Sequence, residues 1–414
     1  MKVKLSLFNV KLLIHIITFL LCVITYANSK YANFFYAFIL FETLFLVITQ
    51  RNFSDIKKAF KNIIIILLFY LVFFIVSILF NEFKVNSIKA GISILLTPAI
   101  IFNAVIFYNE LTMKDVVKIR KIYFVFILAS VLFGIFEFIT KKNFLVPYFD
   151  HNYLTNTVPY RSGSFFKHPI TFSIVLGVAF CLLLGRNHTF IFKSLIIIAL
   201  LMTRTRSSLI GLAVVLFFWL IKNIGFNIKK RTLLLVLLIA LFIISPLGLN
   251  IISMVVERFS GSIDSISGSQ RLGTINYVVK RVFDFGSNPL SEFFRCLFGH
   301  GADSVRQLML HTRIVIPGFD TTDNYYVTML YNYGLFGLTG MILSIIWVVK
   351  NFFKSRSILE EKLFAALIFF AIVGFFCELL EAKLHVYIIA QLLGIIFMQN
   401  NYNINKEDTQ WEKA

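Results

Sequence analysis

The sequence predicts an all-α, polytopic membrane protein with about twelve transmembrane helices and a long extracytoplasmic loop. Hydrophobic residues occupy 58% of its 414 positions and charged residues only 15%, whereas a soluble globular protein carries about 25% charged residues. The apolar residues form repeated runs of about 17 or more residues, the length that is needed to cross a bilayer. These runs are continuous rather than alternating, which excludes a transmembrane β-barrel.

Twelve apolar segments are the expected spans, and they place residues 1–414 in one integral membrane domain. Their ranges are 11–27, 31–49, 63–80, 89–108, 121–140, 169–185, 190–203, 206–222, 232–249, 324–349, 362–380 and 384–399. The first follows several lysines but precedes no small-residue cleavage site, so we expect an uncleaved span and not a signal peptide. The seventh is short for a hydrocarbon core of about 30 Å, and we expect it to be tilted or partly re-entrant.

The distribution of lysine and arginine between the short loops predicts the orientation of the chain. Basic loops alternate with loops that are poor in positive charge, and basic loops of membrane proteins face the cytoplasm. The basic loops contain Lys2, Lys4 and Lys11; Arg51, Lys57, Lys58 and Lys61; Lys114, Lys118, Arg120 and Lys121; Lys222, Lys229, Lys230 and Arg231; and Lys350, Lys354, Arg356 and Lys362. Both termini are therefore expected in the cytoplasm, and the loops 141–168 and 250–323 outside it.

The same rule explains most of the net charge of +19. Nucleic acid is not an expected partner, because no soluble domain is large enough to present a basic face. Of the four cysteines only Cys296 lies outside the apolar runs, so we expect it to be exposed and expect no disulfide framework. No metal or cofactor is expected, because no cluster of potential ligands has metal-binding spacing and no nucleotide-binding glycine loop occurs.

The second outer loop, 250–323, has helical patterns of its own. Apolar residues recur at helical spacing from Arg271 to Phe283, and shorter amphipathic stretches follow at 290–298 and 305–310. We expect short interfacial helices that lie on the membrane surface. A loop of this length with its own helices is more often functional than a linker.

Two arginines stand among four hydroxyl residues in the turn Thr203-Arg204-Thr205-Arg206-Ser207-Ser208, between two spans. Arginine is disfavoured on the outer side of a membrane protein, and its planar fork binds phosphate through two parallel hydrogen bonds. We therefore expect Arg204 and Arg206 to bind an anion such as a lipid diphosphate of the outer leaflet. The alternative is that they only anchor the helix ends at the interface.

Four further cations lie in the outer loops. Arg161 and Lys167 belong to the first loop, and Arg271 and Arg313 to the second, which has nearly as many acidic as basic residues. Individual arginines therefore matter more here than bulk charge. We expect Arg161, Lys167 and Arg313 to bind anionic groups of a substrate and Arg271 to take part in catalysis; ordinary cationic loops are the alternative.

Asp323 and Asn324 head the tenth span at its outer end. Asp323 is the first candidate for a general base at the membrane surface, and Asn324 is a candidate substrate ligand. The alternative role for both is that of helix N-cap. His311 is a second candidate base, because histidine titrates near neutrality, and His300 is a third.

Two other features of the spans carry expectations. Gly334 and Gly337 are expected to allow close helix packing. Glutamates within or near the ends of spans are costly unless they are paired or hydrated, and each is a candidate partner of the arginines. They are Glu42, Glu137, Glu378 and Glu381.

These features together resemble the O-antigen polymerase and O-antigen ligase superfamily of bacterial inner membranes. The resemblance covers the span architecture, the Arg161-Ser162-Gly163-Ser164-Phe165 loop and the Arg204/Arg206 turn. It also covers Gly299-His300-Gly301 and the segment from Asp323-Asn324 to Gly334-x-x-Gly337. The ligases carry His-Asn where this chain has Asp323-Asn324, and this departure favours the polymerase branch.

The resemblance implies a metal-independent glycosyltransferase that takes an oligosaccharide from a polyprenyl diphosphate carrier at the outer face of the bacterial cytoplasmic membrane. Its expected partners are the carrier-linked oligosaccharide, the lipid bilayer, a chain-length regulator and a flippase. The residues suit this chemistry independently, because arginines stabilise a departing diphosphate and a carboxylate or imidazole accepts the proton of the acceptor hydroxyl.

Two other functions stay open from the sequence. The first is an O-antigen ligase that transfers finished glycan to lipid A core or another acceptor. The second is a transporter or flippase of the same lipid-linked oligosaccharide. Transporters often have internal repeats and polar sites at the bilayer midplane, whereas this sequence has no visible repeat and its polar residues lie at one face.

Overall fold

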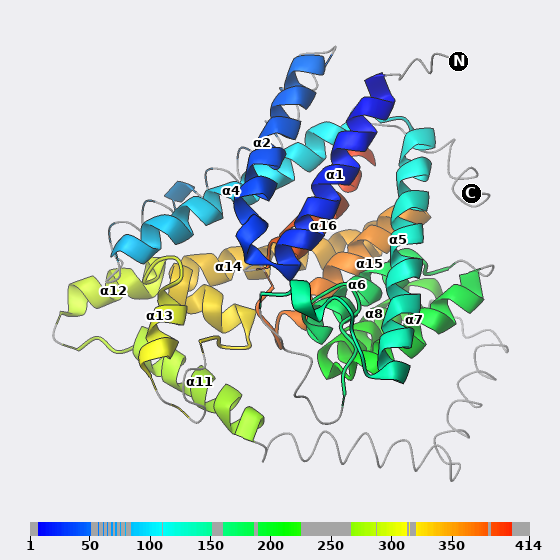
Figure 1. Ribbon diagram of the computed structural model, residues 1–414. Coiled ribbons are helices and arrows are strands. Elements are labelled where there is room, and N and C mark those ends of the chain that lie inside the picture. Colours follow the sequence, from blue (N-terminus) through cyan, green and yellow to red (C-terminus); the bar gives the residue numbers. More distant parts are fainter. Residues whose placement is uncertain are drawn as a thin grey trace, which may run out of the picture.

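The computed structural model describes residues 7–50, 84–109, 111–150, 160–185, 189–224, 266–286, 288–312, 314, 320–379 and 382–399, with single positions between 57 and 79. Within these ranges the chain is helical and has no β-strand, which confirms the predicted all-α class. The helices are α1 (Leu7–Ala27), α2 (Ala32–Thr49), α4 (Lys84–Asn109), α5 (Met113–Thr140), α6 (Pro169–Leu182), α7 (Phe190–Thr203), α8 (Arg206–Ile224), α11 (Ile266–Val282), α12 (Pro289–Phe298), α13 (Ser304–His311), α14 (Tyr325–Lys354), α15 (Ile358–Val373) and α16 (Lys383–Gln399), with the 3-10 turns η1 (Ser29–Tyr31) and η2 (Val146–Tyr148). Figure 1 shows α11 to α13 gathered beside α14, away from α5 to α8.

Among the described residues, five helices are long and apolar enough to cross a membrane, so the chain is a helical membrane protein. They are Asn9–Ala27, Ser29–Thr49, Asp115–Thr140, Arg206–Asn223 and Tyr325–Lys354. Four shorter apolar helices, Leu96–Asn109, Pro169–Leu182, Phe190–Thr203 and Lys383–Gln399, coincide with further predicted spans. The predicted spans 63–80 and 232–249 lie outside the continuously described ranges. The predicted seventh span is α7, whose 14 residues extend over only about 21 Å.

Helix α15 is the centre of the packed core. It contacts α6, α8 and α14, and its buried residues run from Leu359 to Val373 on all sides of the helix. A helix that is apolar on every face is buried on every face. Helix α16 packs along α4 and also contacts α1 and α15, so that one continuous apolar core joins these helices.

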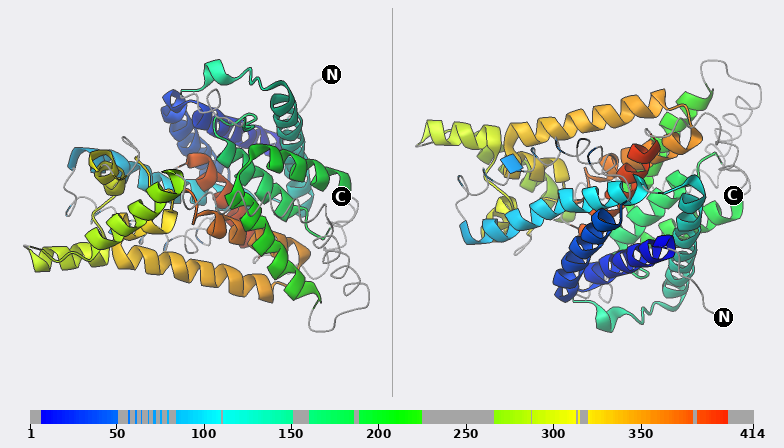
Figure 2. Two further views of the ribbon diagram at one scale, coloured as in Figure 1. Left: turned by 90° about the horizontal axis from the view of Figure 1, so that it is seen from below. Right: turned by 90° about the horizontal axis from the view of Figure 1, so that it is seen from above.

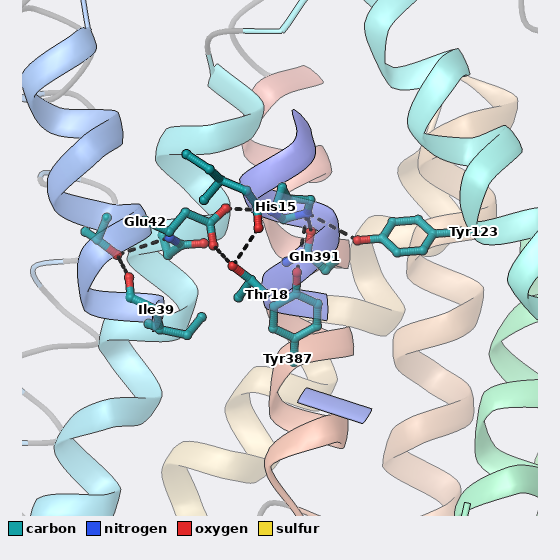
Figure 3. A network of polar contacts seen from close by, with 10 residues as sticks. His15, Thr18, Ile39, Glu42, Tyr123, Tyr387 and Gln391 are labelled. Carbon is teal, nitrogen blue, oxygen red and sulfur yellow. Dashed lines mark hydrogen bonds and ion pairs between the residues drawn. The ribbon is translucent and has the colours of Figure 1, made fainter. Parts of the chain in front are cut away.

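A buried polar network joins α1, α2, α5 and α16 (Figure 3). His15 Nδ1 lies 2.9 Å from Glu42 Oε1, and His15 Nε2 lies 3.1 Å from Gln391 Oε1. Thr18 Oγ1 donates to Glu42 Oε2 at 2.6 Å, and Tyr123 Oη lies 3.2 Å from His15 Nε2. A carboxylate at this depth is stable only when it is paired. The expectation that Glu42 is paired is confirmed, and its partner is His15 rather than an arginine.

The three amphipathic stretches of the second outer loop form α11, α12 and α13, which confirms that they are helices. Helix α11 begins at Ile266, ahead of the predicted start at Arg271. Apolar residues of the three helices meet α14 in a second, smaller core that includes Val278, Met309 and Leu330. Cys296 belongs to this core and is only 4% exposed, so the expectation of an exposed cysteine was wrong. The residue lies on the inner face of an amphipathic helix.

Helix α14 is interrupted at Gly334, whose φ of 67° and ψ of −166° are not helical. Gly299, which ends α12 with a φ of 89°, lies against this kink. A Cβ at Gly334 would lie 2.4 Å from the Leu297 carbonyl group, and a Cβ at Gly299 would lie 2.3 Å from the backbone carbonyl oxygen of Asn332. Gly334 therefore permits close packing, as predicted, but its neighbour is the end of α12. Figure 2 shows the resulting arrangement, with the long arm of α14 extending away from α12 along one flank.

We predict that Gly334→Ala destabilises the protein by more than about 2 kcal/mol, because alanine resists this φ and its Cβ overlaps the Leu297 carbonyl. The measurement is thermal unfolding of the purified protein in detergent. Gly286→Ala is the matched control, since its Cβ would meet nothing closer than Asp284 Oδ1 at 3.7 Å, and a shift below about 0.5 kcal/mol is expected for it. Equal stability losses in the two variants would contradict the prediction.

Candidate functional site

The candidate site begins with an ion pair between α11 and the start of α14. Arg271 Nε and Nη2 both donate to Asp323 Oδ2, at 3.0 and 2.9 Å. Thr321 Oγ1 donates to the other oxygen, Asp323 Oδ1, at 3.1 Å. Two of the three predicted catalytic residues therefore contact each other directly, although 52 positions separate them in the sequence.

Asn324, and not Asp323, caps helix α14. Its Oδ1 accepts from Tyr326 N at 3.0 Å and from Val327 N at 3.2 Å. Asp323 precedes the cap with a φ of 51°, and this left-handed turn directs its carboxylate toward Arg271. The N-cap alternative for Asp323 is therefore wrong. The side-chain oxygen of Asn324 already accepts hydrogen bonds from the backbone of α14. The predicted role of Asn324 as a substrate ligand therefore stays a prediction for its side-chain amide nitrogen only.

A buried carboxylate supports this turn from the loop that follows α15. Thr322 Oγ1 and Thr328 Oγ1 donate to Glu378 Oε1 at 2.6 and 2.5 Å. Tyr325 N donates to Gly374 O at 2.8 Å, which fixes the start of α14 to the end of α15. Glu378 was expected to be paired, and its Oε1 accepts from Thr322 in the turn that presents Asp323 and from Thr328 at the start of α14, whereas its Oε2 has no partner.

The second part of the site is the Arg161 loop, which lies on the turn between α7 and α8. Arg161 Nε donates to Thr203 O at 3.0 Å, and its Nη2 donates to Thr205 Oγ1 at 3.1 Å. Ser162 N donates to Met202 O at 3.2 Å. The structure thus brings Arg161 to the turn that carries the other two candidate arginines.

Arg204 and Arg206 flank the turn that Arg161 contacts. Arg204 ends α7 with a φ of 54°, and its guanidinium carbon lies 5.9 Å from the centre of the Phe138 ring. Arg206 is the first residue of α8. Three predicted anion-binding arginines therefore lie on two adjoining loops.

Glu137 holds the Arg161 loop in place. This fully buried carboxylate accepts from Gly163 N and Ser164 N, at 3.1 and 2.6 Å to Oε2. Ser162 Oγ and Tyr160 Oη also donate to it, at 3.0 and 2.9 Å. The sequence pointed to Glu137 as costly unless paired but not to these partners. The available signal was a glutamate near the end of a span that is followed by a loop rich in serine and glycine.

Lys167 is paired within the protein. Its Nζ lies 3.0 Å from Asp150 Oδ1 and 5.6 Å from the centre of the Tyr26 ring. Burial alone would raise the pKa of Asp150, but hydrogen bonds from Ser29 N and Lys167 outweigh burial and bring this pKa to about 2. The Lys167 charge is therefore largely matched by Asp150, so that a substrate anion would have to compete with this carboxylate.

His168 connects the loop to α6 and lies near His385 in the first turn of α16. Its Nδ1 accepts from Ile170 N at 3.1 Å and caps α6. Burial, together with the nearby charges of Arg161, Lys167 and His385, lowers the pKa of His168 to about 4. His385 Nδ1 lies 2.9 Å from Leu379 O, next to Glu378. The loop that follows α15 therefore contacts the start of α14 through Glu378, and the first turn of α16 approaches His168 through His385.

The remaining candidates lie apart from these contacts or outside the described residues. His311 is exposed at the C-terminal end of α13. His300 is 5% exposed and its ring stacks on Tyr331 at 4.1 Å, so it is part of the packing at the kink. Arg313 and Glu381 lie outside the described ranges. No group of three or more potential metal ligands occurs among the described residues.

No protein-family model matches the sequence, and no curated protein shows significant similarity to it.

We predict that His168 makes folding stability depend on pH. Its folded pKa of about 4 is below the ordinary value of about 6.5, so between these values the unfolded chain binds more protons and stability rises with pH. The stabilisation is complete above about pH 6.5 and is lost as the pH falls toward 4. His168→Asn keeps a cap acceptor and removes the titration. Thermal unfolding at pH 7.5, 5.5 and 4.5 should show the variant losing less stability than the wild type, and parallel losses would contradict the prediction.

Proposed function

We propose that the protein is a membrane glycosyltransferase that polymerises oligosaccharide repeat units carried on a polyprenyl diphosphate. The observation that carries this proposal is the gathering of Arg161, Arg204 and Arg206 on adjoining loops, together with the Arg271–Asp323 pair at the start of α14. Guanidinium groups suit a diphosphate leaving group, and the Asp323 carboxylate, which contacts Arg271, suits the deprotonation of an acceptor hydroxyl. Both groups are needed to transfer an already activated sugar.

Arg271 has two roles in the proposed reaction. Its side chain is 41% exposed, and that of Asp323 is 26% exposed, so both can be reached by a substrate. In the free enzyme Arg271 orients the carboxylate. When a diphosphate binds, it competes for the same guanidinium, and Asp323 is released to accept the proton of the acceptor hydroxyl. Carrier binding would thus be coupled to activation of the base.

The proposed topology has twelve spans, both termini in the cytoplasm and the site at the outer face of the bacterial cytoplasmic membrane. Contacts among segments that this topology puts outside support it. The turn after α1 contacts the first outer loop, since Asn28 Nδ2 donates to Tyr148 O at 3.2 Å and Ser29 N donates to Asp150 Oδ2 at 2.9 Å. The same loop contacts the turn between α7 and α8 through Arg161. The proposed partners are two carrier-linked oligosaccharides, a flippase that supplies them and a chain-length regulator.

We predict that Asp323→Asn lowers chain elongation about 100-fold or more, because an amide cannot accept the proton. Polymer length in membranes with equal amounts of inserted protein is the measurement. Arg306 and Asp320 form the matched control pair, at 3.0 Å on the same loop, and Asp320→Asn should leave elongation unchanged because exposed pairs contribute little.

The exchange of the two charges, Arg271→Asp with Asp323→Arg, separates catalysis from structure. It can restore the ion pair but not the carboxylate at position 323. Full elongation in this double variant would overturn the role of Asp323 as base. The glycan pattern of cells that lack the active protein distinguishes a polymerase from a ligase. Loss of long chains with a single capped unit remaining indicates a polymerase. Accumulation of carrier-linked long chains without any capped glycan indicates a ligase.

We predict that Arg204→Lys and Arg206→Lys each lower elongation by about 10² to 10³, because a point charge does not reproduce the bidentate contact to a developing anion. The measurement is again polymer length at equal expression. Lys350→Arg, in a loop that the topology puts in the cytoplasm, controls for exchange of the cation type and should have no effect. Full elongation in both arginine variants would mean that these residues only anchor the helix ends.

A further inference from the structure

A cavity of about 740 Å³ lies between α1, α5, α6, α7, α15 and α16. Its walls are mostly apolar side chains, such as Phe126, Ala179, Leu195 and Ile388. The residues that line it on α16 run from Leu384 to Ile395, a distance of about 17 Å along the helix. Half of a hydrocarbon core is about 15 Å deep, so the cavity is as long as the acyl region of one leaflet.

One end of the cavity is basic. Arg120 and Lys121 line it from the beginning of α5, and Lys362 lines it from the first turns of α15. Lys121 is exposed, so the cavity reaches the protein surface at this end. These residues belong to loops and helix ends that the charge distribution assigns to the cytoplasmic side. The candidate transferase site involves the opposite ends of α5 and α15, beyond Glu137 and Val373.

One polar side chain in the cavity lining, that of Gln391, has a hydrogen-bond donor without a partner. Gln391 is 8% exposed, and its Oε1 lies 3.1 Å from His15 Nε2. Its Nε2 is buried without a hydrogen-bond partner. A buried amide without a partner is costly. Gln391 precedes Ile395 on the helix by about 6 Å, so its N–H groups lie about one helical turn deeper than the cavity lining at Ile395.

We propose that this cavity binds one anionic phospholipid from the cytoplasmic leaflet. The acyl chain fills the apolar part, the phosphate lies at the end formed by Arg120, Lys121 and Lys362, and an ester carbonyl accepts a hydrogen bond from Gln391 Nε2. The order of these features along the cavity matches the order of phosphate, ester and chain in a phospholipid. Lipid binding here does not require the proposed transferase reaction, although the lining of the cavity reaches Phe166 in the Arg161 loop.

The test is native mass spectrometry of the purified full-length protein in detergent, titrated with dioleoylphosphatidylglycerol, dioleoylphosphatidylcholine or a polyprenyl monophosphate. We expect one phosphatidylglycerol to be retained and phosphatidylcholine to bind at least tenfold more weakly. Equal retention of the two phospholipids would overturn the anionic headgroup. Displacement of phosphatidylglycerol by substoichiometric polyprenyl phosphate would overturn the phospholipid as the occupant.

Two pairs of variants locate the bound lipid. Lys121→Gln should weaken phosphatidylglycerol binding about fivefold, whereas Lys118→Gln should not, because Lys118 is an exposed lysine on the same helix that does not line the cavity. Ala179→Phe fills part of the cavity and should abolish retention, whereas Ile198→Phe on the exposed side of α7 should not. If Ala179→Phe does not fold, the lysine pair decides. Equal binding by Lys121→Gln and Lys118→Gln would overturn the site.

Discussion

The cost of burying a carboxylate determines the arrangement of this protein more than any other single constraint. A charged group away from water must be paired or hydrogen-bonded. Glu42 and Glu137 meet this requirement fully, whereas Glu378 accepts hydrogen bonds at Oε1 and its buried Oε2 has no partner. Glu42 binds His15 and Thr18 and joins α1 to α2. Glu137 gathers the amides and hydroxyls of the Arg161 loop, and Glu378 gathers two threonines at the start of α14. Glu137 and Glu378 thus fix segments whose own helical packing would not position them.

The Arg271–Asp323 pair differs from these three in its exposure. Water reaches both side chains, so that the pair adds little to stability. It is held by two rigid supports, since Asn324 caps α14 and Glu378 binds the preceding threonine. A weak, accessible pair on a rigid turn is suited to exchange one partner for a substrate anion. The difference between buried and exposed carboxylates therefore separates residues that position the site from residues that are available to react.

Helical periodicity and charge in the sequence were enough to predict the all-α class, most described helices and the amphipathic segments of the long loop. They also singled out Asp323 and Arg271, because each is a charge at the end of an apolar or amphipathic run, and Arg161, because it is a cation in an outer loop. Their contacts could not be predicted, since Arg161 binds Thr203, 42 positions away, and Arg271 binds Asp323, 52 positions away. The choice between Asp323 and Asn324 as cap depends on one φ angle, and the kink at Gly334 depends on its contact with Gly299. Local patterns contain no information about such pairings.

The two ends of the helices carry different chemistry. At one end, Glu137 holds the loop that carries Arg161, and Glu378 binds the threonine that precedes the accessible Asp323. At the other, Lys121 and Lys362 border an apolar cavity whose inner wall includes Gln391 and Tyr123 of the His15 network. Because α5, α6, α15 and α16 extend from the cavity to the loops of the site, the packing around the cavity also sets where Glu137, His168 and Glu378 lie. Filling of the cavity by lipid would stabilise these helices against one another and, through them, the loops that hold the candidate reactive groups.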